Sequence, residues 1–178
     1  MELTEKTIKT DVIYNGNFIN LEKLTVKLPN GKEASREVVR HPGAVAIVPL
    51  TSDNEVLMVR QYRKPLDKVL LEIPAGKLNY GEDPFECGVR ELEEETGCTA
   101  EKYTFAGQII SAPGFSDEVL SIYIATGLKQ GSQNLDEDEF LTVEKIPFNT
   151  VIELILKNEI EDAKTIVGIL KTKLLLGL

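Results

Sequence analysis

The sequence predicts an α/β protein, in which helices cover a mixed β-sheet and a small antiparallel β-sheet forms at the N-terminus. Short apolar segments typical of strands lie on both sides of one strongly capped helix, and periodic helical segments follow Pro147. At 178 residues, with 42% hydrophobic and 28% charged residues, the chain has the size and composition of one globular domain with a small appendage.

The N-terminal region contains segments that favour a sheet of its own. Three segments have the composition or alternation of strands: 11–14, 20–28 and 35–39. The dipeptide Asn30-Gly31 is a strong hairpin signal between the second and third. His41-Pro42-Gly43 interrupts the pattern, so we expect a sheet segment over residues 1–42 and a main domain over 43–178.

The main domain alternates strand signals with helix signals. We expect strands over 44–50, 55–62, 70–74, 103–110, 120–126 and 140–145. The segments 151–157 and 162–176 have helical periodicity and close the chain.

The best-defined helix of the chain is expected between Pro84 and Thr96. Asp83 suits the N-cap, Pro84 suits the first helical position, and Gly97 is a natural C-terminal stop. At 3.6 residues per turn, four residues fall on one face: Phe85, Val89, Leu92 and Thr96.

Three glutamates fall on the opposite side of this predicted helix. Glu91, Glu94 and Glu95 are spaced i, i+3 and i+4, so their charges repel one another and destabilise the helix. A bound cation would reverse that effect, and oxygen ligands suit Mg²⁺ or Mn²⁺. The alternative interpretation is a solvated acidic face without a ligand.

The residues around these glutamates form a longer fixed pattern. It runs from Gly76 through Glu82 and Arg90-Glu91-Leu92 to Glu94-Glu95, Gly97 and Cys98. This pattern resembles the Nudix box of hydrolases that cleave a nucleoside diphosphate linked to a further group. Cys98 stands where an aliphatic residue is more usual. The resemblance implies a Nudix-type α/β/α sandwich.

The resemblance also implies roles for residues of the box. Glu91 and Glu95 correspond to the metal ligands, the carbonyl of Ala75 adds an oxygen, and Glu94 is a further ligand when several ions bind. The divalent ion neutralises phosphate oxygens and lowers the pKa of a bound water. Four residues are expected to fix the geometry of the loop and helix: Gly76, Glu82, Arg90 and Gly97.

Segments outside the box resemble bacterial ADP-ribose pyrophosphatases. Pro113 lies 15 residues beyond Cys98, a distance similar to that in this subgroup. The expected substrate-binding residues are Phe18, Arg36, Glu37, Arg63 and Glu118. Arg63 would pair with a diphosphate oxygen, and Phe18 would stack on adenine. The alternatives are a surface ion pair for Arg63 and an ordinary core or interface aromatic for Phe18.

The resemblance places the general base in a loop before a late strand. The matching segment here is Asp136-Glu137-Asp138-Glu139. Glu139 is the first candidate for the carboxylate that deprotonates the attacking water, Glu137 is the second, and Glu118 is the next.

Charge and cysteine usage limit the partners and the compartment. A net charge of −9 argues against a nucleic-acid surface, and since no apolar run has the length needed, we expect neither a signal peptide nor a membrane span. Cys87 and Cys98 lie at opposite ends of the predicted helix and cannot form a disulfide, which favours the cytoplasm. In the resembling enzymes the N-terminal sheet crosses to a second subunit, so we expect a homodimer.

The sequence therefore leads to three hypotheses. The first is metal-dependent hydrolysis of ADP-ribose to AMP and ribose 5-phosphate. The second is a nucleotide-sugar pyrophosphatase with another preferred substrate. The third is a module that binds ADP-ribose without cleaving it, against which the intact acidic cluster argues.

Overall fold

The computed structural model describes residues 2–135 and 139–178, and the chain divides into two compact units. The N-terminal unit consists of Met1–Gly43 together with Ile110–Val119. The second unit consists of Ala44–Ile109 and Leu120–Leu178. The sequence predicted one boundary, after residue 42, with residues 110–119 in the main domain. The structure instead places these residues in the N-terminal unit.

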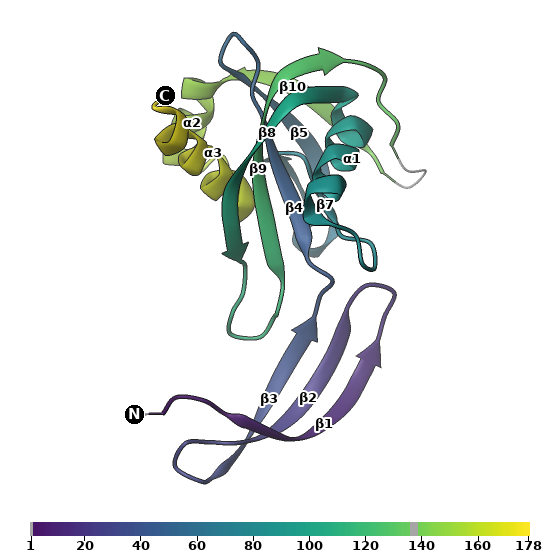
Figure 1. Cartoon of the computed structure of the whole chain (residues 1–178), viewed down its shortest axis with the longest axis vertical. Coiled ribbons are helices and arrows are strands. Elements are labelled where there is room, and N and C mark those ends of the chain that lie inside the picture. The colour runs from purple at the N-terminus through teal and green to yellow at the C-terminus, as the bar shows by residue number, and fades with distance from the viewer. Residues whose placement is uncertain (1, 136–138) are drawn as a thin grey trace. The chain divides into compact units, whose positions relative to one another are not determined.

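The N-terminal unit is built on a three-stranded antiparallel sheet in the order β1-β2-β3 (Figure 1). Its strands are β1 (Lys6–Asn15), β2 (Asn20–Lys27) and β3 (Glu33–Arg40). Gly31 has a φ of 83°, a backbone conformation that glycine adopts easily, in the turn between β2 and β3. The small antiparallel sheet predicted from the sequence is confirmed.

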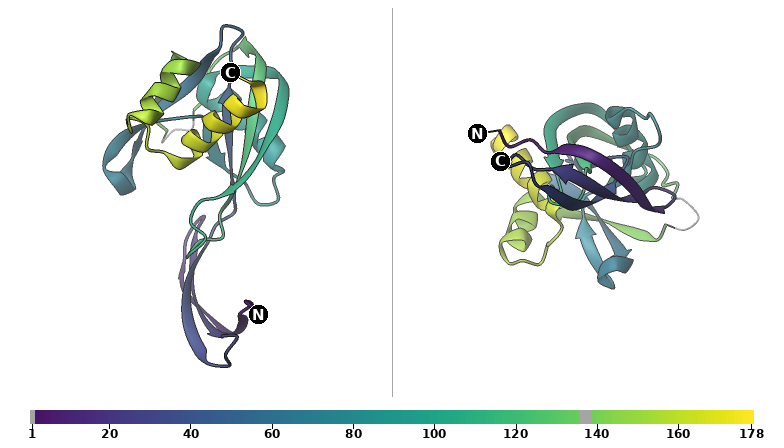
Figure 2. Two further views of the ribbon diagram at one scale, coloured as in Figure 1. Left: turned by 90° about the vertical axis from the view of Figure 1, so that its left-hand side faces the viewer. Right: turned by 90° about the horizontal axis from the view of Figure 1, so that it is seen from below.

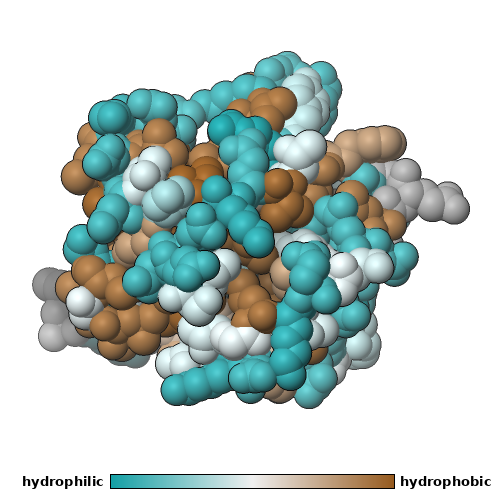
Figure 3. All heavy atoms as spheres, turned by 90° about the horizontal axis from the view of Figure 1, so that it is seen from above, coloured by the Kyte–Doolittle hydropathy of each residue, from teal (hydrophilic) through white to brown (hydrophobic). Residues whose placement is uncertain are grey.

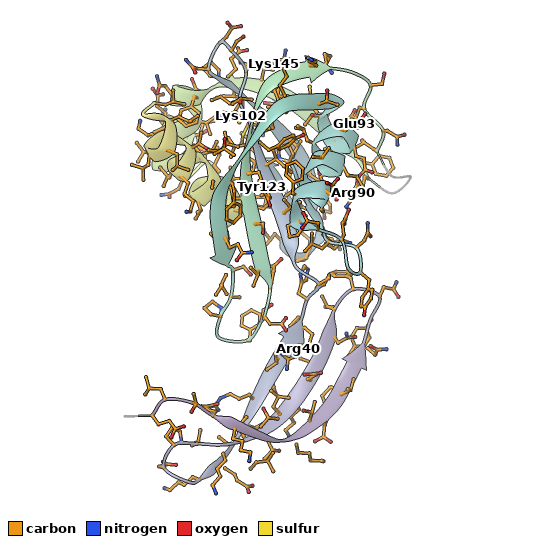
Figure 4. All side chains as sticks on the ribbon, viewed as in Figure 1. Arg40, Arg90, Glu93, Lys102, Tyr123 and Lys145 are labelled. Atoms are coloured by element: carbon orange, nitrogen blue, oxygen red, sulfur yellow. The ribbon has the colours of Figure 1, made fainter. Side chains whose placement is uncertain are left out.

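The segment 110–119 joins this unit through contacts with the end of β3. The Val39 N–H donates to the Phe115 carbonyl over 2.7 Å, and the Asp117 N–H donates to the Val39 carbonyl over 3.2 Å. Arg40, labelled in Figure 4, forms an ion pair with Asp117 at 3.1 Å. These bonds attach a segment far along the sequence to the N-terminal sheet.

The second unit contains two sheets, of four and three strands. The first has the order β7-β4-β9-β8 and the second has the order β10-β5-β6. The strands are β4 (Ala44–Pro49), β5 (Glu55–Arg63), β6 (Lys68–Glu72), β7 (Ala75–Lys77), β8 (Cys98–Ile110), β9 (Val119–Gln130) and β10 (Leu141–Pro147). Strand β4 is parallel to β9 and antiparallel to β7, so the larger sheet is mixed, as predicted.

Helices cover both faces of the larger sheet. They are α1 (Pro84–Thr96), α2 (Phe148–Leu156) and α3 (Ala163–Leu176). Along β4, Ala46 and Val48 belong to the core that contains residues of α2 and α3, whereas Val45 and Ile47 belong to the core that contains residues of α1. Figure 2 shows α2 and α3 together against the sheet, and Figure 1 shows α1 across it from them. The predicted α/β/α sandwich is confirmed.

Two short elements were not predicted. The strand β7 has three residues, and a 3-10 helix spans Lys64–Leu66. Neither is long enough to show a periodic pattern, since a strand needs about four residues to display alternation. Strand β7 matters for function because it lies at the start of the Gly76–Cys98 pattern.

Figure 3 shows hydrophobic residues in separate patches among hydrophilic ones on the face that it presents. In the described residues, no helix has both the length and the apolar composition needed to cross a membrane.

Candidate active site

The helix α1 begins and ends as the sequence predicts. The Asp83 side chain accepts from the Phe85 N–H over 2.8 Å, and Pro84 occupies the first helical position. Gly97 ends the helix with a φ of 69° and donates its N–H to the Glu93 carbonyl. These caps fix the register of the acidic residues that lie between them.

Burial on α1 does not follow the apolar face that helical periodicity predicts. Glu91 and Glu95 are 7% and 2% exposed, and they are buried together with Leu92, whereas Phe85 is 39% exposed. The two glutamates lie in the row next to Leu92 and Thr96, and the neighbouring strands cover both rows. Phe85 lies at the start of the helix, with its ring against Tyr103 and Tyr123.

A glycine makes room for the buried acidic row. A Cβ on Gly76 of β7 would lie 1.8 Å from a carboxylate oxygen of Glu91. Any larger residue would therefore displace this carboxylate. Gly76 therefore acts by leaving space for the Glu91 side chain. The fixed spacing between Gly76 and Glu91 is the feature of the sequence that indicates this role.

Arg90 lies at the centre of a cluster of three carboxylates. Its Nε donates to Glu82 over 3.0 Å, and its Nη1 contacts Glu91 at 2.8 Å and Glu94 at 2.7 Å. Glu82 also accepts from the Asn79 N–H over 2.7 Å, so Arg90 connects the loop before α1 to the helix (Figure 4). This geometry supports the role of Glu82 and Arg90 in holding the loop against α1.

Glu95 is a buried carboxyl group with few partners that would stabilise its negative charge. One of its oxygens accepts from the Ala75 N–H over 3.1 Å. Burial, together with the charges of Glu91 and Glu139, raises the pKa of Glu95 to about 8. Burial also raises the pKa of Glu91, although Arg90 opposes this. The pair thus forms a site where positive charge is in deficit.

Among the described residues, no three His, Cys, Asp or Glu side chains form a ready-made metal site. Glu91 and Glu94 direct oxygens at Arg90, and Glu95 accepts from β7. The donor set nevertheless fits a divalent cation: its side chains supply oxygen alone, and their buried charge lacks a full counterion.

Of the two candidate bases in the acidic segment 136–139, one is described. Glu137 lies outside the described residues. Glu139 is half-buried, and its charge contributes to the raised pKa of both Glu91 and Glu95. The fold therefore brings Glu139 near the two box glutamates, although it follows them by more than 40 residues.

Arg63 also lies within the electrostatic reach of this cluster. The charge of Glu95 contributes to the raised pKa of Arg63, whose largest cause is the hydrogen bond with Glu72. Arg63 contacts Glu72 through Nε at 2.8 Å and through Nη2 at 2.7 Å. Arg63 thus forms an ion pair, as the alternative expects, but its partner Glu72 is buried. Sequence analysis missed Glu72, although a charge inside the apolar segment 70–74 was a signal.

The other expected substrate residues lie in the N-terminal unit. Phe18 is exposed and approaches the His41 ring edge-on at 6.0 Å, and Glu118 contacts His41 Nδ1 at 3.7 Å. Arg36 donates through Nε to Glu5 over 3.0 Å. Arg36 and Glu37 line a cavity of about 390 Å³ together with residues 113–117.

The raised pKa of Glu95 predicts how the stability of the metal-free protein depends on pH. The folded state binds the proton of the Glu95 carboxyl group more tightly than the unfolded state does. Protonation of Glu95 therefore contributes to the free energy of unfolding below the ordinary pKa of 4.5, and this contribution is lost as pH rises through about 8. We expect Glu95→Gln to remove this loss and to raise the free energy of unfolding at pH 9 by about 2–4 kcal/mol relative to wild type. Urea unfolding in chelator at pH 5 and pH 9 measures it; equal pH slopes for both proteins would contradict the assignment.

The chain matches known families over nearly its whole length. The family model described as NUDIX domain matches residues 40–167. A second model, described as nucleoside diphosphate sugar hydrolase N-terminal domain, matches residues 5–39.

Similar proteins span most of the chain. It is 46% identical over 167 residues to a protein of Bacillus methanolicus named methanol dehydrogenase activator, covering 93% of this chain and 90% of that protein. It is 45% identical over 165 residues to a protein of Bacillus subtilis (strain 168) named ADP-ribose pyrophosphatase, covering 92% and 89%. A crystal structure titled ADP compounds hydrolase shares the fold, with a TM-score of 0.87 at 22% identity over 99% of this chain and 97% of that one.

Proposed function

Because the chain belongs to the NUDIX family, we propose that it hydrolyses the pyrophosphate of ADP-ribose to AMP and ribose 5-phosphate with a divalent cation. The observation that carries this proposal is the buried pair Glu91 and Glu95, held against β7 beside Arg63 and Glu139. The identity of 45% to a protein named ADP-ribose pyrophosphatase supports the substrate.

Glu91, Glu95 and the Ala75 carbonyl would hold the cation, and Glu94 would serve a further ion. When bound, a divalent ion neutralises phosphate oxygens and lowers the pKa of a coordinated water. NUDIX hydrolases generally need such ions, and oxygen-only ligands suit Mg²⁺ or Mn²⁺.

The remaining side chains would position the substrate and move the proton. Arg63 would bind a diphosphate oxygen, because a guanidinium matches phosphate geometry. Glu139 would accept the proton of the attacking water. Gly76, Glu82, Arg90 and Gly97 would keep the loop and helix in register. From the N-terminal unit, Phe18, Arg36, Glu37 and Glu118 would contact the nucleotide.

A substrate panel tests the proposed specificity. We expect ADP-ribose to give a higher kcat/KM than GDP-mannose and UDP-glucose with Mg²⁺ and with Mn²⁺. Greater efficiency on a non-adenine substrate would favour the nucleotide-sugar alternative. Tight binding of ADP-ribose without turnover at saturating Mg²⁺ would favour a non-hydrolysing binding module.

A second candidate function follows from the relative named methanol dehydrogenase activator, which is 46% identical to this chain. The chain would raise the rate of a methanol dehydrogenase. Dehydrogenase rates with and without the chain test this, and Glu95→Gln shows whether activation needs the acidic pair. An unchanged rate would exclude activation of the dehydrogenase tested.

We further propose a cytoplasmic homodimer. Cys87 and Cys98 are both free, which supports a reducing compartment. Strand β1 is exposed along almost its entire length, and the buried hydrophobic residues of the N-terminal sheet are Leu24 and Val26. Small sheets need a packed face, which a second subunit would supply.

Removal of residues 1–42 tests this assembly. We expect the truncated protein to be a monomer that binds ADP-ribose poorly, because Phe18, Arg36 and Glu37 are lost with the sheet. Sedimentation and calorimetry measure the two effects, and full-length Arg36→Gln should bind weakly while remaining a dimer. A full-length protein that is monomeric at micromolar concentration and fully active would refute the arrangement.

A further inference from the structure

Glu72 is a charged residue in a position otherwise typical of the core. It ends β6 between the buried Leu71 and Ile73, and it is only 1% exposed. Both of its oxygens have partners: Oε1 accepts from Arg63 Nε over 2.8 Å, and Oε2 accepts from Arg63 Nη2 over 2.7 Å and from Lys164 Nζ. A buried carboxylate persists only with such partners, and this bidentate geometry fixes the plane of the guanidinium.

The strand register does not itself create this pair. Arg63 lies opposite Lys68 in the ladder between β5 and β6, whereas Glu72 lies opposite Val59. The Arg63 side chain must therefore run back along the strand to reach Glu72. Lys68, its direct neighbour, contacts Glu161 instead. The guanidinium is held where Glu72 places it.

The first turn of α3 anchors Glu72. Lys164 lies in this turn and contacts both Glu72 and Asp162. A positive charge near a helix N-terminus is unfavourable, and these two carboxylates offset that cost. Asp162 caps α3 by accepting from the Thr165 N–H over 2.9 Å, and the Thr165 hydroxyl accepts from the Ile73 N–H over 2.9 Å. Helix α3 thus holds both the side chain of Glu72 and the backbone beside it.

Arg63 is the most solvent-exposed side chain of this network. The side chain of Glu72 is 1% exposed, those of Lys164 and Asp162 are 14% and 17% exposed, and that of Arg63 is 36% exposed. The two acids and two bases balance in charge, so nothing in the network requires Arg63 to bind an anion for neutrality. Glu72 occupies two of the five N–H groups of the guanidinium, which leaves the others for a further acceptor.

We propose, building on the proposed function, that Glu72 is a positioning residue that presents the Arg63 guanidinium to the diphosphate of the substrate. The first turn of α3 holds Glu72 in place for this role. An arginine whose plane and reach are fixed before binding loses less side-chain entropy when it contacts phosphate. Glu72 acts through Arg63 and does not touch the substrate.

The variant Glu72→Gln tests this role because it keeps the size of the side chain but weakens its hold on Arg63. We expect KM for ADP-ribose to rise about tenfold or more, with kcat changing much less, since a contact made in the ground state is lost. The dissociation constant of ADP-ribose in chelator should rise in parallel. In the Arg63→Gln background, Glu72→Gln should change neither constant further, because both changes remove one interaction.

Lys68→Gln is the matched control. Lys68 lies opposite Arg63 in the same ladder but contacts Glu161, so its replacement removes a nearby charge without touching Glu72, and KM should stay near the wild-type value. If Lys68→Gln raises KM as much as Glu72→Gln does, or if the effects of Glu72→Gln and Arg63→Gln add, the positioning role is wrong.

Two outcomes separate this role from the proposed function. A wild-type protein that turns over no nucleotide sugar contradicts the function, and the dissociation constants then still decide the role of Glu72. Wild-type turnover with unchanged KM in Glu72→Gln contradicts only the role of Glu72. If Glu72→Gln does not fold, Glu72→Asp replaces it in the test, because it keeps the charge but shortens the reach to Arg63. We expect Glu72→Asp to raise KM above the wild-type value, and an unchanged KM overturns the proposal.

Discussion

Glu95→Gln is expected to lower the turnover of ADP-ribose by several orders of magnitude while the protein remains folded. Glutamine has nearly the same size but lacks the negative charge with which a carboxylate ligand attracts a divalent ion. Glu95 is 2% exposed and lies against the Ala75 N–H, so the substitution alters the site itself and little else. Steady-state assays over a range of Mg²⁺ concentrations measure the loss.

Glu93→Gln is the matched control for this experiment. Glu93 lies on the same helix, two residues away, but its side chain is exposed (labelled in Figure 4). We expect activity close to wild type from Glu93→Gln. Activity of Glu95→Gln above about a tenth of wild type would mean that this carboxylate is not an essential ligand.

The caps of α1 could be predicted because they depend on local chemistry. Asp83, Pro84 and Gly97 each act within one turn of the helix, and the structure places all three as expected. The alternating strands were also predictable, since alternation reports burial on one face or both. The exact ends of the strands depend on partners elsewhere in the chain, and β1 and β8 are longer than their patterns indicate.

The burial of Glu91 and Glu95 could not be predicted from helical periodicity. A helix between strands is covered over a wide arc, and residue type then no longer reports which rows are buried. The fixed spacing from Gly76 to Glu91 contained that information, because the glycine leaves space for the carboxylate. The pairing of Arg63 with Glu72, and of Glu72 with Lys164, joins residues up to 92 positions apart, and only the fold brings them together.

Glu139→Gln is expected to lower kcat by roughly 10²–10⁴-fold with little change in KM, as for loss of a general base. Glu139 lies close enough to Glu91 and Glu95 for its charge to raise the pKa of both, so it would lie near a water bound at that pair. The amide of glutamine can still orient a water but cannot accept its proton. Higher pH should restore part of the rate, since hydroxide then replaces the base.

Comparison with two further variants makes this assignment specific. Glu144→Gln is the control, because Glu144 lies on β10, pairs with Arg60, and is not among the charges that raise the pKa of Glu91 and Glu95; its kcat should match wild type. Glu137→Gln should have a smaller effect than Glu139→Gln. If Glu137→Gln lowers kcat more than Glu139→Gln does, Glu137 is the base. If neither variant lowers kcat, the base lies elsewhere, and Glu118 is the next residue to replace. A general base at Glu139 is therefore supported only if its variant alone loses kcat and the acidic limb of the pH–rate profile together.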